Sequence, residues 1–150
     1  MLYIGADHAG FHLKERIKEY LVSAGISFND LGNLVYDSAD DYPDFAFKVA
    51  KKVGLKKDAR GILFCGSAFG VAIAANKVKG IRAVPVHSVR EAEFSRLHND
   101  ANILCLSGWH LSFGIAKKIV SAWLKAKFSR ASRHVRRLKK IEMIERGKWR

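Results

Sequence analysis

The residues best suited to chemistry lie in the segment Cys65-Gly66-Ser67-Ala68-Phe69-Gly70. A cysteine thiolate can act as a base, and a turn of small residues lets backbone amides approach an anion. We expect the amides of Ser67 to Val71 to point at a ligand, to stabilise an oxyanion such as an enediolate, and to stabilise the Cys65 thiolate. The alternative is a buried structural cysteine, and the turn lacks the glycine patterns of nucleotide-binding motifs.

Two further polar segments could transfer protons. A carboxylate beside an imidazole, as in Asp7-His8, suits proton transfer to sugar oxygens, but Asp7 could equally cap a helix and leave His8 exposed. His98-Asn99-Asp100 precedes a strand, which puts it at the amino ends of the strands, opposite Cys65. It is either a surface loop or a segment that a second subunit brings to the site.

The C-terminal part of the chain is strongly basic. Its excess of lysine and arginine begins at Lys127, and the whole chain carries a formal charge of +13. Arg133 and Arg137 are one helical turn apart and could hold a phosphate between them. A solvated basic helix is the alternative, and a nucleic acid, an acidic membrane or an anionic substrate could each explain the charge.

The elements that position these residues alternate between short apolar strands and amphipathic helices. The pattern predicts strands at 2–5, 27–31, 61–64, 81–86 and 101–106, and helices at 11–24, 43–53, 71–77, 89–97, 111–125 and 134–145. This order indicates an α/β fold: a three-layer, Rossmann-like, doubly wound parallel sheet with a C-terminal helix. Ligands of such sheets bind beyond the carboxyl ends of the strands, which should bring Asp7 and Cys65 together.

Length and composition fit a single domain spanning residues 1–150. Cys65 and Cys105 lack the spacing of a zinc site, which favours a reduced, cytoplasmic protein without a metal. The N-terminus does not resemble a signal peptide, and no apolar run is long enough to cross a membrane.

Six segments in one order are similar to the ribose-5-phosphate isomerase B family, which also contains galactose-6-phosphate and allose-6-phosphate isomerases. They are Gly5–Gly10, Asp41–Asp44, Cys65–Ser67 with Gly70, Ile73–Lys77, His98–Asn102, and Arg133–His134 with Arg136–Arg137. These segments extend over nearly the whole chain. The resemblance implies an aldose–ketose isomerase of the pentose phosphate pathway that acts on ribose 5-phosphate and needs no cofactor and no metal.

The resemblance also implies a role for each matching residue. Cys65 would be the base that moves a proton between C1 and C2, assisted by the Ser67 hydroxyl. The turn from Gly66 through Ala68 to Gly70 would supply oxyanion-hole amides. Asp7 and His98 would transfer protons during ring opening, and Asn99 would bind the substrate. The phosphate would be held by His8, Arg133 and Arg137, and Tyr42 would line the sugar pocket.

The family forms dimers with shared sites, often paired into tetramers. We therefore expect a homodimer in which the basic helix, about 133–146, packs on the partner and His98 enters the partner's pocket. Three positions depart from the family pattern. Ala68 stands where glycine is usual, Phe69 is bulkier than the usual Ile or Val, and Trp109 replaces an arginine that helps to hold the phosphate, a role that His110 could take.

Two alternatives remain open. One is a related hexose-6-phosphate isomerase acting on allose or galactose 6-phosphate. The other is a non-catalytic relative that binds nucleic acid through the basic tail, although no aromatic–basic RNA motif supports it.

Overall fold

The computed structural model describes residues 1–149, and within them one five-stranded sheet carries helices on both faces. The strands are β1 (Leu2–Ala6), β2 (Phe28–Asp30), β3 (Arg60–Cys65), β4 (Ala83–Pro85) and β5 (Ile103–Ser107). The helices are α1 (His8–Ser23), α2 (Tyr42–Gly54), α3 (Phe69–Ala75), α4 (Val89–Asn99), α5 (Phe113–Lys125) and α6 (Ser132–Glu145).

All strand pairs are parallel, in the order β2-β1-β3-β5-β4. This confirms the predicted doubly wound α/β fold. The chain moves from β1 to one side of the sheet and then returns to build the other side from β3, so the order reverses between β1 and β3. Doubly wound sheets bind their ligands at the carboxyl ends of these two strands. Asp7 directly follows β1 there, and Cys65 is the last residue of β3.

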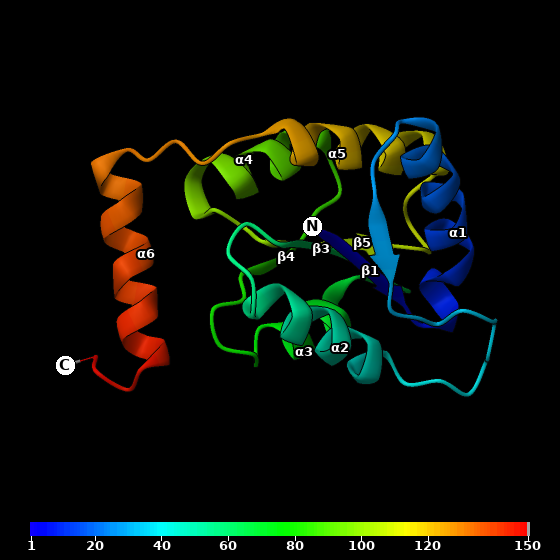
Figure 1. Ribbon diagram of the computed structural model, residues 1–150, viewed down its shortest axis with the longest axis horizontal. Coiled ribbons are helices and arrows are strands. Elements are labelled where there is room, and N and C mark those ends of the chain that lie inside the picture. Colours follow the sequence, from blue (N-terminus) through cyan, green and yellow to red (C-terminus); the bar gives the residue numbers. More distant parts are fainter. Residues whose placement is uncertain (150) are drawn as a thin grey trace.

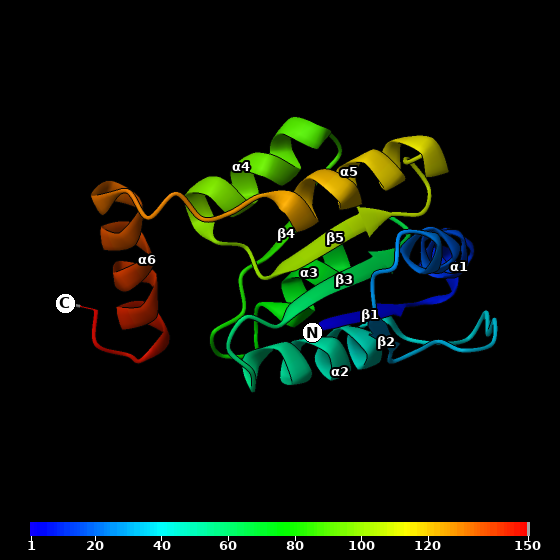
Figure 2. The same cartoon turned by 45° about the horizontal axis from the view of Figure 1, so that its top comes forward.

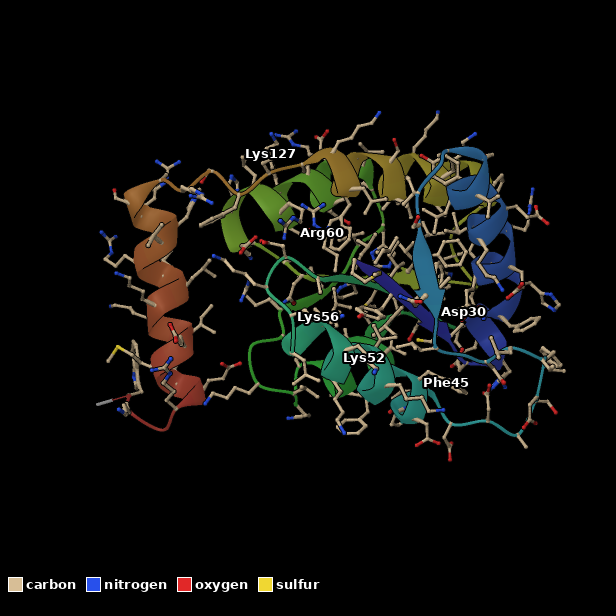
Figure 3. All side chains as sticks on the ribbon, in the orientation of Figure 1. Asp30, Phe45, Lys52, Lys56, Arg60 and Lys127 are labelled. Atoms are coloured by element: carbon tan, nitrogen blue, oxygen red, sulfur yellow. The ribbon has the colours of Figure 1, made fainter. Side chains whose placement is uncertain are left out.

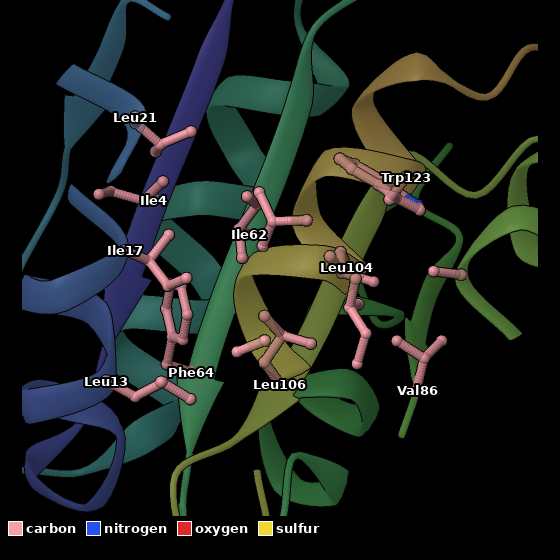
Figure 4. Close-up of a cluster of buried hydrophobic side chains, with 14 of the residues drawn as sticks. Ile4, Leu13, Ile17, Leu21, Ile62, Phe64, Val86, Leu104, Leu106 and Trp123 are labelled. Carbon is pink, nitrogen blue, oxygen red and sulfur yellow. The ribbon is translucent and has the colours of Figure 1, made fainter. Parts of the chain in front are cut away.

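Three layers enclose two separate apolar cores. Helices α1, α4 and α5 cover one face of the sheet, and α2 and α3 cover the other (Figures 1 and 2). On the first face Phe64, Leu104 and Trp123 pack between the sheet and its helices (Figure 4). The strands β3 and β5 are buried on both faces, which explains why their sequences are continuously apolar instead of alternating.

Some element boundaries differ from those predicted. Helix α1 begins at His8 because Asp7 caps it, and α3 begins at Phe69, directly after the left-handed Ala68. Strand β4 is shorter than expected and lies at the edge of the sheet, where a proline such as Pro85 is tolerated.

Helix α6 stands beside the rest of the structure (Figure 1). It contacts α4, and near its other end Glu145 accepts a hydrogen bond from the Gly80 amide at 2.8 Å. Most of its residues are exposed, including the apolar Ile141, Met143 and Ile144. Among residues 1–149, none of the helices has the length and apolar character needed to cross a membrane.

The carboxyl edge of the sheet depends on a close approach between α1 and β3. Gly10, in the first turn of α1, lies so near the backbone of Phe64 that an added Cβ would sit 2.6 Å from the Phe64 Cβ. Such a distance is far below van der Waals contact, so any side chain here must push α1 away from β3.

We expect Gly10→Ala to lower the free energy of unfolding by about 1–3 kcal/mol, the usual cost of overpacking a core. Gly114→Ala is the matched control, because Gly114 also lies in a helix but has nothing within 4 Å of an added Cβ. There the substitution should stabilise by about 0.5–1 kcal/mol. Urea unfolding of both variants measures the difference, and equal effects would contradict the close-packing argument.

Candidate active site

Cys65 ends β3, and its Sγ lies inside the turn that leads to α3. The Ala68 amide donates to this sulfur at 3.2 Å, and the Phe69 amide donates to the Ser67 hydroxyl at 3.3 Å. The prediction that these amides point outward at a ligand is therefore wrong for Ala68 and Phe69. The left-handed backbone of Ala68 turns the chain back over the end of the strand, so that both amides bond within the turn.

The structure also contradicts the expected stabilisation of the Cys65 thiolate, because the pKa of the thiol is raised. Burial raises the pKa of the thiol, and the nearby Asp7 carboxylate raises it further. The amides of Val71, Ala68 and Ser67 oppose this shift but do not outweigh it. The thiol is therefore a stronger base once ionised, but a smaller fraction of it is ionised at neutral pH.

Aromatic rings cover the two glycines of the turn. A Cβ on Gly66 would lie 2.5 Å from the indole of Trp109, and a Cβ on Gly70 would lie 2.9 Å from the ring of Tyr42. A side chain at either position would therefore displace the neighbouring ring. Tyr42 was expected near the site, whereas the contact between Trp109 and Gly66 had no signal in the sequence.

The third small residue of the turn, Ala68, adopts φ = +71°. This left-handed conformation favours glycine, and for other residues it costs roughly 1–2 kcal/mol. The methyl group is fully buried, so its packing offsets part of that cost. The departure from glycine noted in the sequence is thus accommodated, and the neighbouring Phe69 side chain is exposed.

The segment after β5 is tied to the same turn. The Ser107 hydroxyl donates to the Gly66 carbonyl at 2.5 Å, and the Gly108 amide donates to the Cys65 carbonyl at 2.9 Å. The Trp109 amide also donates to the Gly66 carbonyl. These bonds hold the Trp109 indole over the turn, while His110 stays exposed beside it.

Asp7 caps α1, as the simpler interpretation of the sequence suggested. Its Oδ1 accepts from the Gly10 amide at 2.9 Å, and the residue is buried. Burial raises the pKa of Asp7 despite this bond and despite the charge of His8. A carboxyl group of raised pKa holds its proton more readily than an ordinary one, which suits an acid–base role.

His8 is oriented by a carboxylate from the loop before α2. Asp40 Oδ1 accepts from both the His8 amide, at 2.9 Å, and its Nδ1, at 2.8 Å. This hydrogen bond raises the pKa of His8, so the imidazole keeps its positive charge to higher pH. The sequence offered no signal that Asp40, one of several aspartates in this loop, is the partner of His8.

His98 lies at the opposite edge of the sheet. It belongs to the last turn of α4, and the parallel strand β5 that follows brings the chain back to the level of Cys65 only at Ser107. The His98 ring stacks on Phe94, with centroids 4.9 Å apart, and lies 4.7 Å from the ring of His134.

The basic residues of α6 belong to this second group. Arg133 Nε donates to His134 Nε2 at 3.3 Å, and Arg137 lies one turn further along α6. Burial lowers the pKa of His134, and the charges of His98, Arg133 and Arg137 lower it further. Arg133, Arg137 and Asn99 are exposed. One chain therefore gathers two sets of predicted site residues at opposite edges of its sheet, with Asp7, His8, Tyr42, Cys65, Gly66, Ser67, Ala68 and Gly70 at one and His98, Asn99, Arg133 and Arg137 at the other.

Among residues 1–149, no group of three or more His, Cys, Asp or Glu side chains is placed to hold a metal ion.

Fold and site together define an α/β protein with a cysteine at the switch point of a parallel sheet. The chain belongs to the ribose/galactose isomerase family, whose model matches residues 2–141. It is 45% identical to a probable ribose-5-phosphate isomerase B of Mycoplasma genitalium over 97% of this chain and 95% of that protein. It is 41% identical to the ribose-5-phosphate isomerase B of Escherichia coli over 94% of this chain and 93% of that one.

Solved structures show the same similarity. The Mycoplasma genitalium ribose-5-phosphate isomerase B with bound ribulose-5-phosphate superposes with a TM-score of 0.93 at 45% identity, over 97% of this chain and 95% of that one. The Clostridium thermocellum ribose-5-phosphate isomerase B gives a TM-score of 0.92 at 44% identity, over 97% of both chains.

We expect Asp40→Asn to lower the pKa of His8 toward its ordinary value, because the neutral amide no longer stabilises the imidazolium. The His8 side chain should then lose its charge at lower pH. An NMR titration of its Cε1 proton measures the shift. Asp37→Asn is the control, since Asp37 lies in the same loop and bonds the Ala39 amide instead. Equal shifts in the two variants would show that general loop charge sets the His8 pKa.

Proposed function

We propose that this chain interconverts ribose 5-phosphate and ribulose 5-phosphate, with Cys65 as the base. The observation that carries the proposal is the position of Cys65 Sγ, at the carboxyl end of β3 beside the turn and near Asp7. The bound ribulose-5-phosphate of the similar Mycoplasma genitalium enzyme supports the choice of sugar. The two free cysteines support a reducing compartment, the cytoplasm, where the pentose phosphate pathway operates.

The reaction needs only proton transfers. The Cys65 thiolate removes the proton from C2 of the open aldose, and the electron pair of that bond moves through C1 to the carbonyl oxygen, giving an enediolate. The thiol then returns the proton to C1, and the proton of the C2 hydroxyl moves to O1, which leaves the ketose with its carbonyl at C2 and a hydroxyl at C1. The amides of Gly66 and Gly70 stabilise the negative charge, because those of Ser67, Ala68 and Phe69 bond within the turn, and the Ser67 hydroxyl assists.

The remaining roles follow from charge and position. Asp7, with its raised pKa, and His98 transfer protons during ring opening, and Asn99 binds the substrate. Three cationic side chains hold the phosphate: His8, whose charge Asp40 maintains, with Arg133 and Arg137. Tyr42 and Trp109 flank the turn and limit the space for the sugar, and His110 is available beside the indole.

These roles require two chains. Cys65 and His98 lie at opposite edges of one sheet, so His98, Asn99 and the arginines of α6 can serve a site only when a second copy receives them. We therefore propose a homodimer with shared sites, able to pair into a tetramer. The exposed apolar side chains of α6 support its packing on the partner.

A hexose-6-phosphate isomerase is the second candidate, because the family description covers galactose as well as ribose. The Trp109 indole over Gly66 favours the smaller pentose, since it occupies space beside the turn. Nucleic-acid binding by the basic tail is the weakest candidate.

Cys65→Ala should lower kcat on ribose 5-phosphate by roughly 10²–10⁴-fold, because the reaction loses its base. Cys105→Ala is the matched control: Cys105 is fully buried within β5, opposite Leu63 and two residues before the strand reaches the level of Cys65, and this variant should keep most activity. Turnover of ribose 5-phosphate, allose 6-phosphate and galactose 6-phosphate by the wild type identifies the substrate. Near-normal activity of Cys65→Ala would refute the role of the thiol.

Mixed dimers test the sharing of sites. Cys65→Ala and His98→Ala chains should each be nearly inactive alone, but a hybrid dimer contains one site with both residues intact. Random exchange of subunits should restore roughly a quarter of wild-type activity, since half of the dimers are hybrids with one working site in two. Native mass spectrometry confirms that hybrids form. Hybrids that form and stay inactive would contradict a shared site.

A further inference from the structure

A cationic cavity lies at the amino edge of the sheet, away from Cys65. It has a volume of about 410 Å³ and opens between the end of α2, the start of β3 and the segment before β5. Six cationic side chains line it: Lys56, Lys57, Arg60, Arg82, Arg96 and Arg130. Figure 3 labels Lys56 and Arg60 on the segment that leads from α2 into β3. Neither is among the residues assigned to catalysis.

Carboxylates neutralise only part of this charge. Two aspartates, Asp58 and Asp100, line the cavity, and Asp100 pairs with Arg82 at 3.0 Å and with Arg96 at 2.9 Å. In the part of the chain that the structure describes, no ion pair joins Arg60 or Arg130 to a carboxylate.

Backbone carbonyls hold the guanidinium groups in place. Arg60 donates to the Leu124 carbonyl at 2.7 Å, and Arg96 donates to the Ala101 carbonyl at 2.6 Å. Arg96 is only 7% exposed, and its Nε has no hydrogen-bond partner within residues 1–149. Burial lowers the pKa of Arg96, and the positive charges of Arg60 and Arg82 lower it further. Arg60, Arg82 and Arg96 are thus held in place while their charges repel one another, as expected of a site that an anion completes.

The lining also indicates what kind of anion fits. Val53 and Ala59 are its only apolar side chains beyond the aliphatic stems of the cations, so no ring could stack a nucleobase. A cavity of this size, lined by several planar guanidinium groups, suits an ion that presents oxygens in many directions. We propose that this cavity binds a small polyanion of the diphosphate class, either free or as the phosphates of a sugar bisphosphate. The proposal does not depend on the isomerase activity.

Isothermal titration calorimetry of the full-length protein with inorganic diphosphate tests the site, and fructose 1,6-bisphosphate serves as the probe for a sugar-borne source. The Arg60→Gln/Arg130→Gln variant should bind diphosphate at least tenfold more weakly, because it loses two charge-assisted contacts. The Arg133→Gln/Arg137→Gln variant is the control, since it removes the same charge from the phosphate-holding residues. It should keep a diphosphate site of wild-type affinity.

Because Arg60 holds the end of α5, the first variant could be destabilised. Lys56→Gln/Lys57→Gln avoids this problem. Both lysines are exposed, and within residues 1–149 their side chains make no hydrogen bond and no ion pair. It should weaken binding several-fold with unchanged circular dichroism. Equal weakening in the cavity and control variants would show general electrostatic attraction and overturn the proposal. Loss of diphosphate binding in the control variant alone would also overturn the proposal. The same holds if the wild type binds neither diphosphate nor fructose 1,6-bisphosphate at millimolar concentration.

Discussion

The candidate active site depends on glycines that let three chain segments touch at the carboxyl edge of the sheet. Gly10 places α1 directly against the backbone of Phe64, and Gly108 lies against Ala9 and Gly10, within contact distance of their backbones. A side chain at either position would separate the ends of β1, β3 and β5. The segments that carry Asp7, Cys65 and Trp109 therefore come together only because backbone meets backbone here. The chemistry of the site rests on this packing more than on any single polar contact.

A buried charge organises the neighbouring loop. Lys14 is fully buried in α1, and its Nζ donates to Asp30 at 2.8 Å and to the Asn33 carbonyl at 2.5 Å. Burial alone would raise the pKa of Asp30, but hydrogen bonds from Lys14, Lys18 and the Gly32 amide outweigh burial and lower it. Asn33 in turn donates to Asp40, the partner of His8. Lys14 and His8 are thus connected through Asn33 and Asp40, so the bonds of one buried side chain help to fix the loop that orients His8.

The sequence predicted the order of the strands and helices well, but it did not predict the pKa of Cys65 or the contacts around it. Continuous apolar runs and caps such as Asp7 specify elements locally, and alternating elements imply parallel strands; this sufficed to put Cys65 and His98 at opposite edges. The pKa of Cys65 could not be predicted, because it is a balance between burial and three amides whose directions depend on the left-handed Ala68. Contacts between distant segments, such as Trp109 on Gly66, carry no local signal at all.

Charged side chains, like the predicted site residues, lie at two opposite edges of the sheet. At the carboxyl edge Asp40 maintains the charge of His8, whereas the amino edge gathers the arginines of α6 near His98 and the cationic cavity that Asp100 helps to line. Asp100 connects these two features, because Arg82 and Arg96 hold it in a left-handed conformation directly after Asn99. An anion that competes with Asp100 for these arginines would loosen the support of His98 and Asn99. Under the proposed sharing of sites, a second chain would present the arginines of α6 to a dianionic sugar phosphate, whereas a polyanion in the cavity would engage Arg82 and Arg96, the arginines that pair with Asp100.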